Sequence, residues 1–257
     1  MSARPKKELG QHFLVDENIL GVIERLAQPA PADVILEIGP GQGILTRYLA
    51  DRVGHVHAIE LDRELEPELR RTLGGRGNVD LHFADALAFD YLSLAPQPTK
   101  LVANLPYNIA TPLVAESLDG LPSIESWTVM VQREVADRLF AAEGTKAYGA
   151  VSVYVRLATE RTGFHPVSRN VFRPRPNVDS ALVSFSRKPL PDDFPRVKTI
   201  VAGAFAHRRK TLANSLELSG LATREHAADA LEALGRRPDV RAQELAPEEF
   251  VELTRAL

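Results

Sequence analysis

The stretch VILEIGPGQGILTRYLA, residues 34–50, decides how the first half of the chain is expected to fold. VILEIG (34–39) predicts a short strand, and ILTRYLADRV (44–53) predicts the helix that follows it. Gly39, Gly41 and Gly43 lie between them, where the absence of side chains lets a ligand approach the backbone and the helix N-terminus. A tight turn alone also accounts for these glycines, because their spacing is GxGxG rather than the GxGxxG of dinucleotide enzymes.

The same alternation of strand and helix continues along the chain. Further strands are predicted at 55–61, 79–85, 100–104, 126–132 and 180–186, and helices at 17–27, 62–73, after Asn108 and at 133–140. Asp16 is expected to cap the first of these helices, whereas GAVSVYVRLA (149–158) fits either a strand or a helix. Alternating strands and helices predict βαβ units, and so an α/β fold with a parallel sheet covered by helices on both faces.

A change in the pattern of predicted elements indicates a second domain. KPLPDDFP (188–195) contains three prolines, which interrupt regular structure. Beyond it the sequence predicts helices only, near residues 197–206, 212–218, 224–234 and 247–256. We therefore expect one domain over residues 1–188 and a small all-helical domain over 189–257.

Composition excludes several classes of protein. The 257 residues include no cysteine, so disulfides and thiolate chemistry are excluded, and the seven histidines form no HxxxH pair, so no metal site is expected. No apolar stretch reaches the roughly 18 residues of a membrane span, and the basic N-terminus lacks a signal-peptide core, which predicts a cytoplasmic protein. The net charge of −3 conceals local basic clusters, such as Arg208, Arg209 and Lys210.

Polar residues follow the predicted strands at the edge where open α/β sheets bind ligands. Glu60 ends the second strand, Asp85 the third and Asn104 the fourth. A carboxylate at the position of Glu60 can accept hydrogen bonds from both ribose hydroxyls, although a solvated strand-end carboxylate is an equal alternative for this residue alone. Together with the glycine turn, these residues predict a nucleoside cofactor, either NAD or S-adenosylmethionine.

NLPY, residues 104–107, favours S-adenosylmethionine. The Asn104 side-chain oxygen and the Leu105 carbonyl, directed by the rigid Pro106, would accept hydrogen bonds from an exocyclic adenine amine. This makes the nitrogen able to attack a methyl group, and Tyr107 would stack on the extruded base. A strand-end turn with a core tyrosine is the alternative, but hydride transfer has no use for this set.

Eight motifs in the chain resemble the KsgA/RsmA family, the small-subunit ribosomal RNA adenine N6,N6-dimethyltransferases. They are KKELGQHFL, LEIGPGQGILT, IELDREL, ADAL, NLPYNIATP, VQREVADRL, VFRPRPNVDSALV and FAHRRKTLANSL. The resemblance implies a Rossmann-like class I S-adenosylmethionine-dependent methyltransferase domain with a C-terminal helical domain. It also implies dimethylation of two adjacent adenosines in the hairpin near the 3′ end of 16S rRNA, within the immature small subunit.

The resemblance also assigns roles to residues. Those expected to bind the cofactor are His12, Leu14, Gly39, Gly41, Gly43, Glu60, Asp85 and Asn104. Those expected in catalysis are Asn104, Leu105, Pro106, Tyr107 and Phe172, the last closing on the other face of the target base. Position 12 is His where many relatives carry Asn, and Asn177 replaces a lysine of the PKVDS form of the motif.

The basic clusters are expected to contact rRNA phosphates. The residues implied are Arg173, Arg175, Arg208, Arg209 and Lys210. A solvated charged face is the alternative, and for Lys6 and Lys7 the two interpretations are even. A monomer that uses neither a metal nor a membrane is expected.

Three other functions compete with this one. An erythromycin-resistance methyltransferase would share fold and cofactor but modify one adenosine of 23S rRNA; VFRPRPNVDS and FAHRRKTLANSL argue against it. A structural assembly factor with incidental methylation is the second alternative, and the intact NLPY argues that activity is retained. An NAD-dependent oxidoreductase is disfavoured by the GxGxG spacing and by the lack of a hydride-transfer acid.

Overall fold

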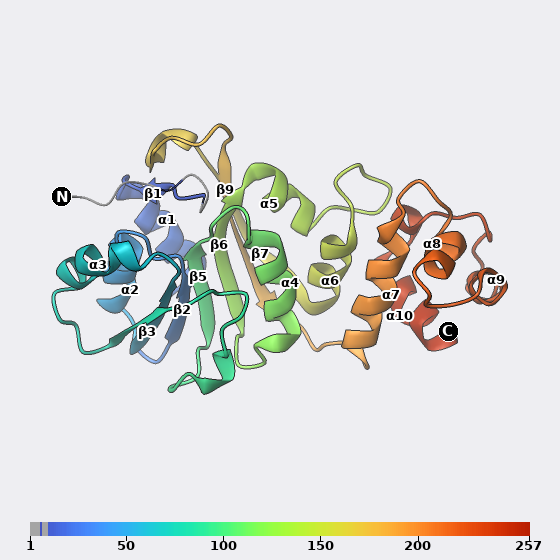
Figure 1. Cartoon of the computed structure of the whole chain (residues 1–257), viewed down its shortest axis with the longest axis horizontal. Helices are drawn as coiled ribbons and strands as arrows, with labels where there is room; N and C mark the ends of the chain where they lie inside the picture. Colours follow the sequence, from blue (N-terminus) through green and yellow to red (C-terminus); the bar gives the residue numbers. More distant parts are fainter. Residues whose placement is uncertain (1–5, 7–9) are drawn as a thin grey trace. The chain divides into compact units, whose positions relative to one another are not determined.

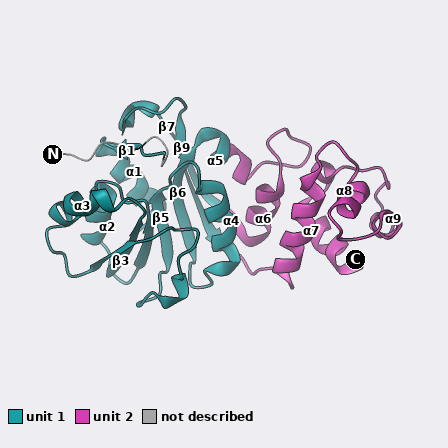
Figure 2. Cartoon of the chain, in the orientation of Figure 1, with its two compact units in different colours: residues 1–136, 161–187 teal, residues 137–160, 188–257 magenta. Residues whose placement is uncertain are grey.

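The chain divides into two compact units in a computed structural model that describes residue 6 and residues 10–257. The first unit holds the described residues up to Ala136 together with Arg161–Arg187, and the second holds Asp137–Glu160 and Lys188–Leu257 (Figure 2). No helix among the described residues has both the length and the apolar character that a membrane crossing requires.

A seven-stranded sheet organises the first unit, with the order β4-β3-β2-β5-β6-β9-β7 (Figure 1). The strands are β2 (Val34–Ile38), β3 (His55–Glu60), β4 (Val79–Phe83), β5 (Lys100–Asn104), β6 (Ser126–Gln132), β7 (Thr159–Val167) and β9 (Ser180–Arg187). The first five strands in this order pair in parallel, and β9 pairs antiparallel with β6. The predicted α/β fold is confirmed, and each predicted strand lies within a residue or two of its expected bounds.

The central strands are apolar on both faces because the sheet is covered on both sides. Ile35 and Leu36 of β2 are neighbours in sequence and point to opposite faces, and both are fully buried. Leu101 and Val102 of β5 repeat this pattern. The carboxyl ends of the parallel strands β2, β3 and β5 therefore meet at one edge of a rigid sheet.

Helices precede, connect and follow the parallel strands. They are α1 (Asn18–Ala27), α2 (Ile44–Ala50), α3 (Glu66–Leu73), α4 (Ala110–Gly120) and α5 (Arg133–Leu139), with 3₁₀ turns η2 (Arg63–Leu65), η3 (Tyr91–Ser93) and η4 (Arg169–Val171). The N-cap residue of α1 is Glu17, which makes no side-chain cap hydrogen bond. The expected cap, Asp16, lies one residue earlier and accepts a hydrogen bond from the Asn18 N–H at 2.9 Å. Helix α1 packs on β6 and β9, and α2 packs on β3.

Strand β7, TERTGFHPV, was not predicted because its glycine and proline are unfavourable in strands. The structure supplies the reason for the glycine. A Cβ at Gly163 would lie 2.5 Å from Leu26 Cδ2 and 2.6 Å from Ser184 Oγ, so only glycine lets β7 approach α1 and β9 this closely.

A second, two-stranded sheet joins segments that are far apart in sequence. Strand β1 (Phe13–Leu14) pairs antiparallel with β8 (Phe172–Arg173), with Leu14 opposite Phe172. The Val15 N–H also donates to the Val171 carbonyl at 2.9 Å. This pairing brings the QHFL and VFRPRP motifs side by side.

The second unit is helical. It contains α6 (Ala150–Ala158), α7 (Phe194–Ala206), α8 (Leu212–Leu218), α9 (Arg224–Ala233), η5 (Ala242–Glu244) and α10 (Pro247–Ala256). The ambiguous stretch 149–158 is thus a helix, α6, and it packs against α7 and α10. The Tyr148 hydroxyl, which precedes α6, donates to the Leu245 carbonyl at 2.8 Å.

These contacts place residues 137–160 with the C-terminal helices, so the second unit is discontinuous. The expected domains, 1–188 and 189–257, were continuous. The two divisions agree near residue 188 and differ over 137–160, because sequence order does not reveal that α6 packs against helices that follow the sheet.

Candidate active site

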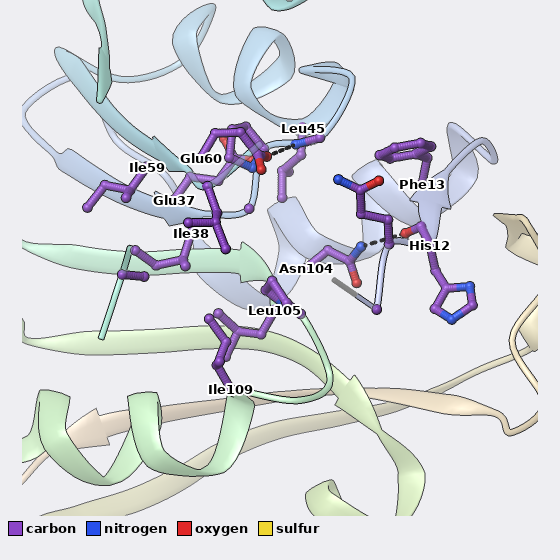
Figure 3. A pocket seen from close by; sticks show the side chains of 18 of the residues that line it. His12, Phe13, Glu37, Ile38, Leu45, Ile59, Glu60, Asn104, Leu105 and Ile109 are labelled. Atoms are coloured by element: carbon purple, nitrogen blue, oxygen red, sulfur yellow. Dashed lines mark hydrogen bonds between the residues drawn. The ribbon is translucent and has the colours of Figure 1, made fainter. Parts of the chain in front are cut away.

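A cavity lies at the carboxyl edge of the sheet, with about 1030 Å³ of open space including the part continuous with solvent. Its lining comes from the ends of β2, β3 and β5, from the loop after β4 and from the N-terminal segment 10–14 (Figure 3). A cavity at this edge is where open α/β sheets bind their ligands. The expected site residues that line it are His12, Leu14, Gly39, Gly41, Glu60, Asp85, Asn104, Leu105, Pro106 and Tyr107.

The glycine turn after β2 has a backbone that requires glycine. Gly39, Gly41 and Gly43 have φ values of +72°, +58° and +80°. A Cβ at Gly39 would lie 3.0 Å from Pro106 Cγ, and one at Gly41 would lie 2.9 Å from the Phe13 ring. The turn therefore fits closely against both NLPY and the N-terminal segment. Gly43 begins α2 and does not line the cavity.

Two buried carboxyl groups lie beneath this turn. Glu60 accepts hydrogen bonds from the Gly41 N–H at 3.1 Å and the Asp62 N–H at 2.9 Å, which fixes its carboxylate at the cavity wall. Burial raises its pKa. Burial also raises the pKa of Glu37 to about 8, and the nearby Glu60 charge adds to the rise. Glu37 Oε2 has no hydrogen-bond partner.

An ion-paired network holds the N-terminal segment at the cavity. Asp62 accepts hydrogen bonds from Lys6 Nζ at 2.7 Å and from Gln11 Nε2 at 2.9 Å. Glu64 lies 3.1 Å from the same lysine. Sequence reasoning gave Gln11 and Asp62 no role, and it left Lys6 open between RNA contact and solvent; the structure places Lys6 in this network. Arg4 and Lys7 lie outside the described residues.

The Asn104 amide is fixed in orientation at the end of β5. Its Nδ2 donates to the His12 carbonyl at 3.2 Å, and its Oδ1 is buried without a hydrogen-bond partner (Figure 3). An unpartnered buried acceptor is unfavourable unless a ligand completes it. The Oδ1 atom is therefore available to a donor that enters the cavity.

The rest of NLPY is also held rigidly. The Leu105 N–H donates to the Met130 carbonyl at 3.1 Å, which holds the backbone that follows Asn104. The Tyr107 hydroxyl and Ser180 Oγ lie 2.6 Å apart, and burial raises the pKa of Tyr107. The His12 ring lies 5.4 Å from the Tyr107 ring, with an angle of 34° between the planes. The amide, the carbonyl and the aromatic face thus occupy one wall of the cavity.

Asp85 lines the cavity, whereas Phe172 does not. Asp85 is exposed, lines the cavity and accepts a hydrogen bond from the Leu87 N–H at 2.9 Å. Phe172 was expected to close on the target base, but its side chain is fully buried in a hydrophobic cluster with Leu14 and Met130. It does not line the cavity, because pairing of β8 with β1 turns it into the core of the first unit.

The residues expected to contact RNA are all exposed, and they fall in both units. Arg173 and Arg175 belong to the first unit and follow η4. Arg208, Arg209 and Lys210 follow α7 in the second unit. Arg208 has a structural role as well, because its guanidinium donates to the carbonyls of Tyr148 at 3.1 Å and Lys146 at 3.4 Å.

Comparison with known proteins decides the family. The model of the family described as ribosomal RNA adenine dimethylase matches residues 2–255. The chain belongs to this family. The dimethylase family uses S-adenosylmethionine, so the chain is an S-adenosylmethionine-dependent rRNA adenine dimethyltransferase.

Relatives within the dimethylase family match over nearly the whole chain. The ribosomal RNA small subunit methyltransferase A of Rubrobacter xylanophilus is 51% identical, with 99% of this chain and 95% of that protein covered. The protein of the same name from Kineococcus radiotolerans is 43% identical, with coverage of 98% and 86%.

Solved structures agree with the dimethylase assignment. A dimethyladenosine transferase from Plasmodium falciparum superposes with a TM-score of 0.78 at 25% identity, covering 94% of this chain and 96% of that one. The 23S rRNA methyltransferase ErmE gives 0.69 at 29% identity, with coverage of 95% and 99%. These matches identify the sheet and the following helices as a class I methyltransferase fold with a C-terminal helical part, as expected.

The residues of the cavity fit S-adenosylmethionine. Glu60 holds a fixed carboxylate at the cavity wall, and the glycine turn packs so closely against Pro106 and Phe13 that no side chain fits at Gly39 or Gly41. The buried Asn104 Oδ1 has no hydrogen-bond partner. This acceptor is unfavourable in the protein alone and would be satisfied by a bound donor.

Proposed function

We propose that this dimethylase acts on 16S rRNA, converting two adjacent adenosines of the 3′-terminal hairpin to N6,N6-dimethyladenosine during assembly of the small subunit in the cytoplasm. The unpartnered Asn104 Oδ1 at the cavity wall supports the proposal that the N6 amine of adenosine is the group methylated. The choice of 16S rRNA is supported by relatives named as small-subunit methyltransferases, one of them 51% identical.

The chain's own residues would divide the task as follows. Glu60 accepts hydrogen bonds from the ribose hydroxyls, Asp85 accepts one from the cofactor's adenine amine, and His12, Leu14 and the glycine turn surround the rest of the cofactor. When bound, S-adenosylmethionine supplies an electrophilic methyl group. Gly43 contributes indirectly, by starting α2 at the turn.

The target adenine would be held by NLPY. Asn104 Oδ1 and the Leu105 carbonyl accept hydrogen bonds from the N6 hydrogens, which favours the geometry in which the nitrogen lone pair can attack. Tyr107 stacks on the extruded base. The nitrogen becomes acidic once it carries the new methyl group and releases its proton to water, so alignment supplies most of the rate.

The exposed arginines would position the RNA. Arg173 and Arg175 in one unit, and Arg209 and Lys210 in the other, offer exposed cations for phosphates. Arg208 would contribute while also supporting the segment before α6. The protein is proposed to act as a monomer.

One experiment tests the substrate. The purified protein is incubated with labelled S-adenosylmethionine and either small or large ribosomal subunits that lack adenine methylation, and the labelled bases are mapped. Label on two adjacent adenosines of 16S rRNA is expected. Label on a single adenosine of 23S rRNA would instead support the erythromycin-resistance type of activity and refute the proposal.

A further inference from the structure

A cluster of titratable side chains lies on β3 and β4, away from the cavity. His55 and His57 alternate along β3 and so share one face of the sheet. Asp80 of β4 lies opposite His57 in the parallel register and points to the same face. None of the three residues lines the cofactor cavity. The methyltransferase chemistry leaves this cluster without a role.

The donor atoms of the cluster converge. One nitrogen of each histidine and one carboxylate oxygen of Asp80 lie within 4.8 Å of one another. Asp80 Oδ2 is 3.0 Å from His55 Nε2 and 3.7 Å from His57 Nδ1. Around a tetrahedral zinc ion with bonds of about 2.0–2.1 Å, ligand atoms lie about 3.4 Å apart. The two separations from Asp80 fall on either side of this value, and the 4.8 Å limit for the whole set exceeds it, so the side chains would close on a bound ion.

The second nitrogen of His57 is already placed as in a metal site. His57 Nε2 lies 2.8 Å from the Pro96 carbonyl, so it carries the proton. The lone pair of His57 Nδ1 faces the cluster and also His82 Nε2 of β4, which lies 3.4 Å away and which a bound ion would replace as its partner. Metal-bound histidines commonly donate their other N–H to a backbone carbonyl in this way.

We propose that His55 Nε2, His57 Nδ1 and an Asp80 carboxylate oxygen bind a divalent first-row transition metal, with Zn²⁺ as the reference ion. Asp80 has 51% of its side chain exposed, so water can complete the coordination from the solvent side. Two imidazoles and one carboxylate select zinc, cobalt or nickel over Mg²⁺ and Ca²⁺, which prefer oxygen ligands.

The HxxxH spacing typical of helical metal sites does not reveal this cluster. HxxxH places two histidines on one face of a helix, whereas HxH does so on a strand. HVH, residues 55–57, is such a pair, and Asp80 joins it only through the register of β3 and β4.

The test uses the full chain after removal of metal with a chelator. Co²⁺ is added as the spectroscopic probe, and Zn²⁺ binding is measured by calorimetry. We expect one equivalent of each to bind, with visible Co²⁺ bands typical of four-coordinate nitrogen and oxygen ligation, and displacement of Co²⁺ by Zn²⁺ but not by millimolar Mg²⁺.

Substitutions test which residues bind the ion. His55→Ala and Asp80→Asn are expected to weaken Zn²⁺ binding by at least about tenfold, whereas the exposed His226→Ala in the other unit should bind as wild type. His57 is avoided because its ring is 1% exposed and its loss could unfold the sheet. Circular dichroism and S-adenosylmethionine affinity, both expected unchanged in the two variants, verify folding.

Two results would overturn the proposal. One is the absence of stoichiometric binding to folded wild-type protein. The other is binding that His55→Ala and Asp80→Asn leave unaltered, which would place the ion elsewhere. Both readouts are independent of methylation, so they stand apart from the outcome of the rRNA experiment.

Discussion

The hydroxyl of Tyr107 and the hydroxyl of Ser180 lie 2.6 Å apart. Tyr107 belongs to the loop after β5, and Ser180 is the first residue of β9, whose side chain is buried. The sheet order places β6 between these strands, so the contact spans the end of the sheet. The orientation of the proposed stacking ring is thus set by a residue 73 positions away in sequence.

Removal of this contact should slow catalysis without affecting the cofactor. We expect Ser180→Ala to lower kcat about fivefold, the equivalent of one hydrogen bond of about 1 kcal/mol, while S-adenosylmethionine affinity is unchanged. Tyr107→Phe should give a similar loss, and the double variant no further loss, because both changes remove one interaction. Single-turnover methylation of small subunits measures the effect.

A serine on the same strand provides the control. Ser184 is also buried on β9, but its hydroxyl accepts a hydrogen bond from Thr162 rather than from the cavity wall. Ser184→Ala should leave kcat unchanged. Additive losses in Ser180→Ala and Tyr107→Phe would show that the two hydroxyls act separately.

Asn104→Ala should abolish most of the activity. Loss of an oriented acceptor at a reacting group costs about 10²–10³ in rate, and the Oδ1 atom is the acceptor that has no internal partner. S-adenosylmethionine affinity, measured by calorimetry, should fall much less, because Glu60 and the glycine turn remain. Wild-type turnover in this variant would remove Asn104 from the mechanism.

Two glycines with nearly the same φ allow the effect of backbone strain to be measured apart from the effect of steric crowding. Gly39 has φ +72° and Gly75 has φ +71°, but a Cβ at Gly39 would meet Pro106 at 3.0 Å, whereas nothing lies within 4 Å of one at Gly75. Each change to alanine should lower the free energy of unfolding by about 1 kcal/mol through backbone strain. Only Gly39→Ala should also weaken S-adenosylmethionine binding, by about tenfold or more. Equal cofactor affinity in the two variants would show that Gly39 matters for its backbone alone.

The buried Glu37 should make stability depend on pH. Because folding raises its pKa to about 8, the native state retains a proton that the unfolded chain releases, and the free energy of unfolding falls as pH rises from its ordinary value of 4.5 toward 8. One such proton contributes at most about 1.4 kcal/mol per pH unit. Glu37→Gln should flatten this decline in urea unfolding curves measured at pH 5, 6, 7 and 8.

Glu60 shares the direction of the shift, so some slope should remain in Glu37→Gln. The exposed Glu225→Gln in the second unit should reproduce the wild-type profile. A wild-type free energy of unfolding that rises over the same interval would contradict the assigned sign.

The cluster after α7 should contribute salt-dependent affinity for small subunits. We expect Arg209→Ala to weaken binding and to lower the slope of log affinity against log salt by about 0.7–0.9 if it contacts one phosphate. Arg208→Ala should in addition lower the melting temperature, because its guanidinium also donates to the Tyr148 carbonyl. Exposed Arg224, on α9, supplies the control substitution to alanine. Identical salt slopes for Arg209→Ala and wild type would exclude a phosphate contact at this residue.

The sequence pattern was sufficient to predict those strands, turns and helices that depend mainly on residues close together in the chain. The length and flanking residues of Val34–Ile38 and Lys100–Asn104 predict buried strands, and the glycines after the first run predict a turn with positive φ. The amphipathic helices were equally clear, α8 and α10 to the residue. Residues at strand ends, such as Glu60 and Asn104, could be assigned to one edge because parallel strands share direction.

The sequence by itself thus determined the α/β fold, the class of cofactor and ten of the residues that line the cavity. Only the tertiary structure decided that Phe172 packs in the core, that Ser180 contacts Tyr107, that residues 137–160 join the C-terminal helices and that Asp80 meets His55 and His57. The physical reason is that strand register and helix packing join residues far apart in the chain. Hydrophobic periodicity records which face of an element is buried, but not what it is buried against.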